Sequence, residues 1–452
     1  MNTKPIVIVG GGLAGSEAAW QIARRGFKVR LYEMRPVKAT LAHKTDHLAE
    51  VVCSNSFKSD QEGTAPWLLK EELKLLDSLL MKIAYETRVP SGASLSVDRQ
   101  RFASAVTEVL CGCPNLEIVR EEIREIPKEE VTILATGPLT SPDLSQSIRE
   151  FAGQEHLYFY DAISPIVDAE TIDLDKVYRA SRYDKGEADY LNCPLDKQEY
   201  LAFYEALIHA ESVPLHNCEK ALYFEACLPI EEMARRGVDT LRYGPMKPVG
   251  LVNPKTGREP YAAAQLRQEN LMADAYSMVG FQNHLRYGEQ ARVLRLIPGL
   301  ERAEFLQFGQ IHRNTYLNAP RVLEPTMQMR EHPRIFFAGQ ITGVEGYVES
   351  VAMGWLAGNN AARCLRGEEL LTAPPRSAIG ALARYVAAAE KKDYQPVNIT
   401  FALLEPLNAA QARGVKRKRD RHLLQVKLAL LEWDNWLETA WKRSEPIMAA
   451  AR

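Results

Sequence analysis

The sequence predicts an α/β protein in which a nucleotide-binding domain is interrupted by a large α+β insertion and followed by a helical C-terminal segment. Three observations support this prediction. A β-branched run near the N-terminus ends in a glycine-rich turn, two later apolar runs also end in glycine, and the chain between those two lacks regular alternation of strand and helix. At 452 residues the chain is about three times as long as a typical domain.

The N-terminal segment has the pattern of a strand–helix–strand unit. Residues 6–9 form a continuous β-branched run, which is typical of a parallel strand buried on both faces. After the turn at 10–15, residues 16–25 have a helical pattern that Gly26 ends. A second strand, 28–33, ends in an acid. The unit predicts a Rossmann-like domain.

The glycine-rich turn has the G-x-G-x-x-G spacing of a dinucleotide-binding site. Gly10 permits a tight turn, Gly12 lets the backbone approach a pyrophosphate, and Gly15 lets helix and strand pack closely. Glu33 is expected to accept hydrogen bonds from ribose hydroxyls. A plain glycine turn in an unliganded domain is the alternative. The predicted binding residues of this unit are Gly10, Gly11, Gly12, Leu13, Ala14, Gly15 and Glu33.

FAD and NAD share this motif, so later segments decide between them. A strand at 131–137 ends in Ala-Thr-Gly137, and a strand at 334–340 ends in Ala-Gly339-Gln340 before a helix at 347–365. This three-part arrangement is typical of flavoproteins and favours FAD as the tightly held cofactor. Gly137, Gly339 and Gln340 are therefore added to the predicted FAD-binding residues.

The remaining pattern divides the chain into four parts. One amphipathic helix is expected at 68–80, another ends near Cys111, and residues 409–441 are expected to be mainly helical. The expected parts are a first section of the FAD-binding domain at 1–150, the insertion at 151–325, a return section at 326–371 and a helical C-terminal segment at 372–452, packed on the FAD domain.

Composition and charge exclude several classes. The chain is 46% hydrophobic and 25% charged with a net charge of −2, which excludes wholesale disorder and a global positive field. Seven cysteines without a CxxC pair predict no zinc site and suit a reducing cytosol. No cleavage site and no apolar stretch long enough to span a membrane are visible. We therefore expect a cytoplasmic protein without bound metal or membrane contact.

Several motifs together resemble the TrmFO family of folate- and FAD-dependent tRNA (uracil-5-)-methyltransferases. Beyond the glycine-rich turn, they are Val-Cys53-Ser-Asn-Ser-Phe-Lys (52–58), Tyr-Phe-Glu-Ala-Cys227-Leu-Pro-Ile-Glu (223–231), Arg242-Tyr-Gly-Pro-Met-Lys247 and Phe-Ala-Gly-Gln-Ile-Thr-Gly-Val-Glu-Gly-Tyr (337–347). The likeness covers nearly the whole chain. The last motif is also similar to the larger tRNA-modifying flavoprotein GidA, whose extra C-terminal length this chain lacks.

The resemblance implies methylation of the T-loop uridine of tRNA (uridine-54) to ribothymidine. Methylenetetrahydrofolate would donate the carbon, and FAD reduced by NADH or NADPH would be the reductant. Uracil C5 becomes nucleophilic after a group adds to C6, and a thiolate suits that addition. Cys53 and Cys227 match the family's two functional cysteines, whereas the residues alone leave a small buried hydrophobic side chain as the alternative for either. Cys227 is interpreted as the C6 nucleophile and Cys53 as a neighbour of the flavin ring, although the sequence leaves the order of their roles open.

Other residues are candidates for substrate binding. His284 is a candidate to stack on a pterin ring, with a buried structural histidine as the alternative. Arg242 and Lys247 flank glycine and proline in a stiff loop that suits a phosphate or a folate glutamate, or is a plain surface loop. Residues 411–427 hold seven basic residues against one acid, which predicts contact with tRNA phosphates or a solvated helix face. The most basic part of this run is Lys416, Arg417, Lys418 and Arg419.

Three rival functions remain at this point. A flavin-dependent disulfide reductase needs a redox cysteine pair, and Cys53 has no close cysteine in the sequence. A flavin monooxygenase needs an aromatic substrate pocket, and a non-catalytic FAD-binding RNA scaffold needs no cysteine. Another FAD-dependent oxidoreductase or a GidA-like tRNA uridine-modifying flavoprotein is thus the alternative. The sequence gives no oligomeric state.

Overall fold

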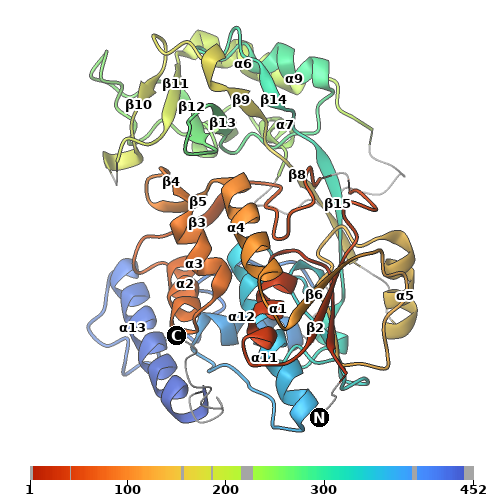
Figure 1. The fold of residues 1–452 in the computed structure, drawn as a ribbon. Coiled ribbons are helices and arrows are strands. Elements are labelled where there is room, and N and C mark those ends of the chain that lie inside the picture. Colours follow the sequence, from red (N-terminus) through yellow and green to blue (C-terminus); the bar gives the residue numbers. More distant parts are fainter. Residues whose placement is uncertain are drawn as a thin grey trace.

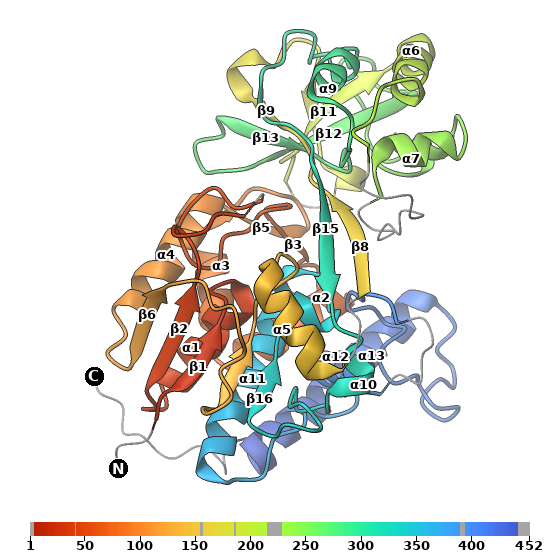
Figure 2. The ribbon, with the colours of Figure 1, turned by 90° about the vertical axis from the view of Figure 1, so that its right-hand side faces the viewer.

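The computed structural model describes residues 4–40, 42–153, 157–184, 187–214, 228–388 and 394–441. These residues form two lobes joined by a two-stranded antiparallel ribbon (Figures 1 and 2). The ribbon consists of β8 (Leu157–Ala162) and β15 (Ile311–Tyr316). In Figure 2, β8 runs from the lower lobe toward the upper lobe and β15 runs back to the lower lobe. We call the lower lobe the first domain and the upper lobe the second domain.

A five-stranded parallel sheet forms the centre of the first domain, in the order β16-β7-β1-β2-β6. The late strand β16 pairs with β7, so the chain returns to the first domain after the second is complete. The prediction of a split Rossmann-like sheet agrees with this topology. The strands are β1 (Ile6–Val9), β2 (Val29–Glu33), β6 (Leu116–Arg120), β7 (Thr132–Leu134) and β16 (Ile335–Phe337).

Two helices of the first domain pack with their backbones very close together. They are α1 (Leu13–Ala23) and α11 (Tyr347–Arg366). A Cβ added at Gly354 would lie 2.2 Å from the Ala14 carbonyl oxygen, and one at Gly358 would lie 2.8 Å from the Ala18 Cα. Glycine at these two positions therefore allows α11 to approach the backbone of α1. This contact fixes α11 next to the glycine-rich turn.

The region between β2 and β6 differs from the expected pattern. A break divides the expected helix at 68–80 into α2 (Ala65–Leu75) and α3 (Leu79–Glu86). Asp77 at the break has φ 58°, and the Ser78 side chain caps α3 by accepting from the Met81 amide. The prediction of one continuous helix was wrong because apolar periodicity does not register this local cap. A small sheet, in the order β3-β5-β4, and α4 complete the region. Their bounds are β3 (Ser56–Ser59), β4 (Arg88–Val89), β5 (Ser94–Val97) and α4 (Arg99–Cys111).

The second domain is built on a six-stranded antiparallel sheet in the order β10-β11-β12-β13-β9-β14. It has its own hydrophobic core, which includes Val167, Phe203 and Phe281. The strands are β9 (Ile166–Asp168), β10 (Tyr178–Arg179), β11 (Leu191–Leu195), β12 (Ala262–Gln268), β13 (Ala275–Met278) and β14 (Phe305–Gln307). The helices are α6 (Lys197–Ile208), α7 (Ile230–Arg235), α8 (Thr240–Tyr243) and α9 (Tyr287–Leu294).

The hydrophobic core of the first domain also includes Tyr316, Leu317 and Leu323, which lie inside the range 151–325 expected for the insertion. They belong to the stretch that leads from β15 through α10 (Ala319–Val322). Helix α5 (Pro142–Ala152) precedes β8 and contributes Leu144 and Ile148 to the same core.

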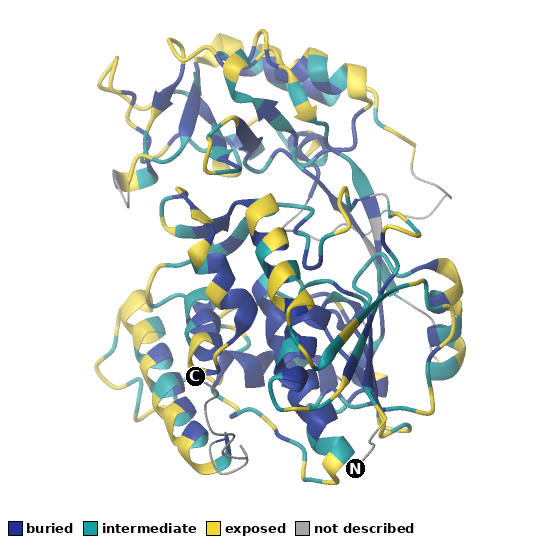
Figure 3. Ribbon diagram, viewed as in Figure 1, coloured by how far each residue is buried: buried dark blue, intermediate teal, exposed yellow. Residues whose placement is uncertain are grey.

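The C-terminal segment packs on the first domain through α12 (Ala378–Ala387) and α13 (Lys418–Trp436). A π-helical turn, η5 (Leu437–Trp441), follows α13 and places Trp441 against Trp355 of α11, with ring centroids 4.9 Å apart. Residues 409–417 are not helical, so the helix begins later than expected. Exposed residues are frequent along α13 (Figure 3). None of the described helices is long and apolar enough to cross a membrane.

Candidate cofactor pocket and active site

The three glycines of the G-x-G-x-x-G motif occupy different environments where β1 leads into α1. Gly10 has φ 105°, and a Cβ there would lie 2.5 Å from the Ala135 carbonyl oxygen. A Cβ at Gly15 would lie 1.9 Å from the Gly10 carbonyl oxygen, whereas a Cβ at Gly12 would meet no atom within 4 Å. Gly10 and Gly15 therefore serve the tight packing of turn, strand and helix. Gly12 instead opens onto a cavity.

This cavity, which we call the cofactor cavity, lies at the carboxyl ends of the parallel strands. It encloses about 1050 Å³, including open solvent at its mouth. Of the predicted cofactor residues, Gly11 and Gly15 are not among those that line it. The predicted residues that do line it are Gly10, Gly12, Leu13, Ala14, Glu33, Gly137, Gly339 and Gln340. The carboxyl ends of parallel strands are the usual place for a nucleotide in such sheets.

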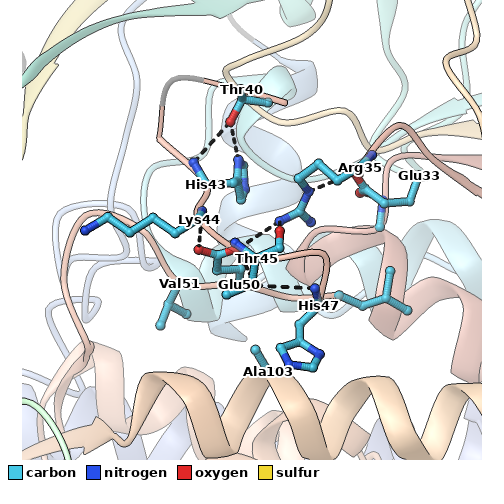
Figure 4. A network of polar contacts seen from close by, with 12 residues as sticks. Glu33, Arg35, Thr40, His43, Lys44, Thr45, His47, Glu50, Val51 and Ala103 are labelled. Carbon is cyan, nitrogen blue, oxygen red and sulfur yellow. Dashed lines mark hydrogen bonds and ion pairs between the residues drawn. The ribbon is translucent and has the colours of Figure 1, made fainter. Parts of the chain in front are cut away.

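Glu33, which is buried and lines the cavity, is part of a network of polar contacts (Figure 4). Its Oε2 accepts from the Gly11 amide at 3.0 Å, and its Oε1 accepts from the Arg35 amide at 3.0 Å and from Arg35 Nε at 2.9 Å. Burial alone would raise the pKa of Glu33, but the hydrogen bonds and charge of Arg35 outweigh it and lower the pKa. The carboxylate is thus ionised and held rigidly. Ribose recognition by Glu33 stays a prediction.

The same network continues through residues that sequence analysis missed. Arg35 Nη1 donates to Glu50 Oε2 at 2.9 Å, and Glu50 also accepts from the backbone amides of Lys44 and Thr45. His43 lines the cavity, and burial together with the charge of Arg35 lowers its pKa to about 4. The His43 imidazole is therefore neutral at physiological pH. The loop that carries these residues has no strand or helix pattern that marks it in the sequence.

Cys53 lines a second cavity, which we call the thiol cavity, and the two cavities share lining residues. The thiol cavity encloses about 460 Å³. The Cys53 and Ser54 amides both donate to Tyr347 Oη at 3.0 Å, so the first residue of α11 fixes the backbone at the thiol. The lining residues common to both cavities are Val52, Pro138, Leu139, Gln340 and Tyr347. A cysteine and the predicted flavin pocket are therefore adjacent.

Titratable groups surround the thiol in this second cavity. Burial and the charge of Asp161 raise the pKa of Glu345 to about 8, and Gln340 Nε2 donates to Glu345 Oε2 at 2.5 Å. His312 is 8% exposed, its pKa is lowered by burial, and its Nε2 has no hydrogen-bond partner among the described residues. At neutral pH the cavity thus contains a protonated carboxyl group and a neutral imidazole.

Lys58 connects the segment that follows Cys53 to other parts of the first domain through its side chain. Its Nζ donates to Glu349 Oε1 at 2.6 Å, to the Glu345 carbonyl oxygen at 3.2 Å and to the Asn398 side-chain oxygen. The Glu349 carboxylate is buried, and its Oε1 also accepts from the Ile399 amide at 3.0 Å. Lys58 therefore ties the loop to the start of α11 and to the C-terminal segment.

The other predicted site residues have separate settings. Cys227 lies outside the described residues, so the structure says nothing of its position. His284 is buried, with Nδ1 2.7 Å from Glu231 Oε1, and Arg242 lies 3.7 Å over the Tyr261 ring and donates to Asp239. Neither these two nor Lys247 is among the residues that line the two cavities described above. Lys416, Arg417, Lys418 and Arg419 are exposed where α13 begins.

Metal-binding geometry is absent from the part of the chain that the structure describes. No group of three or more His, Cys, Asp and Glu side chains there is arranged to hold a metal ion.

Comparison with known proteins identifies the family. The family described as "Glucose inhibited division protein A" matches residues 5–369. A protein of Koribacter versatilis (strain Ellin345) named "Methylenetetrahydrofolate--tRNA-(uracil-5-)-methyltransferase TrmFO" is 58% identical over 441 residues, or 97% of this chain and 99% of that protein. The chain belongs to the TrmFO family. A TrmFO of Bacillus cereus (strain AH187) is 54% identical over 422 residues, covering 93% of this chain and 96% of that protein.

The fold of this TrmFO-family chain is similar to that of a solved flavoprotein-fold structure. The structure of Aquifex aeolicus GidA in its form II crystal superposes with a TM-score of 0.67 at 18% identity, covering 95% of this chain and 74% of that one. At this identity the likeness shows the fold alone. The family resemblance and the fold class predicted from the sequence are both confirmed.

Proposed function

We propose that this TrmFO-family chain methylates C5 of the T-loop uridine of tRNA, uridine-54, to give ribothymidine. Methylenetetrahydrofolate is the carbon donor in this proposal, and NADH or NADPH reduces a bound FAD. The observation that carries the proposal is the Cys53 thiol in a cavity that shares five lining residues with the cofactor cavity. Since the named relatives are uracil-5-methyltransferases, the proposal joins their activity to a thiol placed beside a dinucleotide pocket.

The residues of the cofactor cavity fit FAD. A Cβ at Gly12 would occupy otherwise open space, so glycine leaves room for a pyrophosphate against the backbone at the start of α1. Glu33 lines the same cavity and is held against the turn by the Gly11 amide, as a fixed carboxylate for the ribose. Gly339 and Gln340, before α11, are the residues we assign to the flavin end, because Gln340 also lines the thiol cavity. When bound, FAD supplies the hydride that converts the transferred methylene to a methyl group.

The chain's own groups supply the rest of the chemistry. Addition of a thiolate to uracil C6 makes C5 nucleophilic, and we assign this addition to Cys227. Cys53 lies beside the flavin end of the cofactor cavity, where it handles the one-carbon unit or protects the reduced cofactor. Glu345, protonated at neutral pH, is a proton donor to a group bound in the thiol cavity.

Substrate contacts complete the proposal. We assign the exposed run Lys416 to Arg419 to tRNA phosphates, Arg242 and Lys247 to phosphate or folate glutamate, and His284 to the pterin. A cytoplasmic location follows, since that is where this substrate is found. A disulfide reductase is less well supported, because Cys53 is the only cysteine among the described residues that line the thiol cavity.

RNA that carries 5-fluorouracil at the target position tests this function. The C5 hydrogen must leave as a proton after the methylene group is transferred, and fluorine in its place cannot leave as a cation. The thiol adduct to C6 should therefore accumulate as a covalent complex with wild-type protein. Cys227→Ala should abolish both the complex and methylation while FAD stays bound and reducible. Cys53→Ala should lose methylation with an altered flavin spectrum. Wild-type methylation by Cys227→Ala would refute the nucleophile assignment, and a product other than ribothymidine would favour a GidA-like activity.

A further inference from the structure

The backbone around Cys53 is held from two sides. We call residues 51–55 the Cys53 loop. From the first domain, Tyr347 Oη accepts from the Cys53 and Ser54 amides at 3.0 Å. From the ribbon, the Ala162 carbonyl oxygen lies 3.9 Å from Cys53 Sγ. The thiol thus sits where the first domain meets the ribbon that leads to the second domain.

The second domain contacts the same loop through the end of β12. Arg267 Nη2 donates to Ser54 Oγ at 2.8 Å. Asn55 Nδ2 donates to the Gln268 carbonyl oxygen at 3.0 Å, and Asn55 is fully buried. These bonds join segments more than 200 residues apart. The Cys53 loop is therefore part of the interface between the two domains.

Arg99 and Glu269 form the centre of this interface. Arg99, the first residue of α4, donates through Nη1 to the Val51 carbonyl oxygen at 2.9 Å and to the Val52 carbonyl oxygen at 3.0 Å. Its Nε donates to Glu269 Oε2 at 2.5 Å and its Nη2 to Glu269 Oε1 at 3.4 Å. One guanidinium group of the first domain thus holds the Cys53 loop on one side and a carboxylate of the second domain on the other.

Both charges are mostly removed from water. The Glu269 side chain is 5% exposed and that of Arg99 is 20% exposed. Burial alone would raise the pKa of Glu269, but the charge of Arg99 outweighs it and lowers the pKa. A planar, forked guanidinium is suited to contact carboxylate and carbonyl oxygens together. Without Glu269, Arg99 would remain as a buried charge and would have to change position, and the loop carbonyls would lose their donor.

We propose that Arg99 and Glu269 are positioning residues that set the Cys53 thiol in its cavity by docking the end of β12 onto the Cys53 loop. They act through the loop and not on the substrate. The proposal rests on the proposed function, in which Cys53 takes part in methylation. It goes beyond that function by making the placement of the thiol depend on the second domain.

The structure supplies matched controls. At another point of the same interface, Asp189 Oδ2 accepts from the Gly92 amide at 2.6 Å, and Tyr190 Oη donates to the Ser91 carbonyl oxygen at 3.1 Å. These contacts also join the second domain to the first but do not touch the Cys53 loop. Asp189→Asn and Tyr190→Phe therefore weaken the interface without removing the Arg99 bridge.

The test compares Glu269→Gln and Arg99→Lys with these two controls in the FAD-loaded protein. Amide hydrogen exchange of residues 51–55 reports the loop directly. Methylation and flavin reduction by NADH are measured separately, each per bound FAD. We expect exchange at Cys53 and Ser54 to rise at least about tenfold in Glu269→Gln and Arg99→Lys, and kcat for methylation to fall by a similar factor. The KM for tRNA and the flavin reduction rate should stay within about twofold of wild type.

The outcomes separate this proposal from the proposed function. Unchanged exchange in the Cys53 loop of both Glu269→Gln and Arg99→Lys, or an equal rise in the two controls, would overturn the positioning role. Faster amide exchange of the Cys53 loop in Glu269→Gln and Arg99→Lys alone supports that role, even if wild-type protein makes no ribothymidine. The lack of ribothymidine would overturn the proposed function instead. Parallel loss of FAD reduction and methylation would also contradict the positioning role, since it would show general damage.

Discussion

Substitution of Gly12 by valine should separate cofactor binding from folding. Gly12 has φ −75° and ψ −167°, an extended conformation that any residue adopts, and a Cβ there meets no atom within 4 Å. The free energy of unfolding of the cofactor-free protein should therefore change by no more than about 0.5 kcal/mol. The new side chain instead enters the cofactor cavity, where glycine lets a pyrophosphate approach the backbone.

The expected loss of FAD affinity follows from the steric crowding that valine causes in a site shaped for the cofactor. Forcing extra methyl groups into a packed contact costs about 1–3 kcal/mol, which corresponds to a weakening of FAD binding by about 5- to 150-fold. Gly15→Ala provides the contrast, because its Cβ would lie 1.9 Å from the Gly10 carbonyl oxygen and would force α1 away from β1. That variant should lose both FAD and several degrees of thermal stability.

Two measurements on purified protein decide the matter. The flavin-to-protein absorbance ratio, followed by FAD titration, gives occupancy and Kd, and thermal unfolding without added FAD gives the stability of the fold. Gly288→Val is the control, since a Cβ at this exposed position of α9 also meets open space. Wild-type FAD occupancy and Kd in Gly12→Val would refute the assignment of the turn, and a large fall in its apoprotein Tm would refute the reasoning about open space.

Three further variants probe the thiol cavity, the basic run at the start of α13 and the contact between α1 and α11. Because Glu345 has a pKa raised to about 8 and acts in its protonated form, wild-type methylation should fall as pH rises through about 8. Glu345→Gln should reduce the rate at pH 7 by about 100-fold and lack that pH-dependent fall, and an unchanged pH–rate profile would exclude the proton-donor role. Neutralising residues 416–419 together should raise the KM for tRNA and lower the salt slope of binding by up to about four, with FAD reduction unchanged; equal slopes would leave the run a solvated surface. Gly354→Ala should lower Tm, since its Cβ would lie 2.2 Å from the Ala14 carbonyl oxygen and the clash costs about 3 kcal/mol, whereas an unaltered melting curve would show that α11 can shift.

The sequence was informative where local geometry determines the residue type. The glycine turn and the acid at the end of β2 follow from rules that act within one strand–helix–strand unit, and the structure places Gly12 and Glu33 at the cofactor cavity. The strand that precedes Gly339 could be predicted from its sequence for the same reason. In the structure this strand, β16, pairs in parallel with β7.

The sequence could not reveal groups whose partners lie far along the chain. Arg99 and Glu269 are separated by 170 residues, and Tyr347 meets Cys53 across 294. No periodicity connects such pairs. The Arg99–Glu269 contact depends on how the two domains dock, and the Tyr347–Cys53 contact depends on how distant segments of the first domain pack. The break at Asp77 escaped for a different reason, since one residue with positive φ and a serine cap interrupts a pattern that stays apolar on both sides.

Transfer of a carbon from folate to uracil C5 with the aid of a flavin is the defining step of the proposed function. Purified FAD-loaded protein is incubated with a T-loop RNA, NADH and methylenetetrahydrofolate labelled in its methylene carbon, and the RNA is digested to nucleosides. We expect labelled ribothymidine at uridine-54, with formation dependent on FAD, on NADH or NADPH, and on Cys53. Absence of labelled ribothymidine while the flavin is fully reduced would overturn the proposed function, and equal labelling by Cys53→Ala would overturn the role of Cys53.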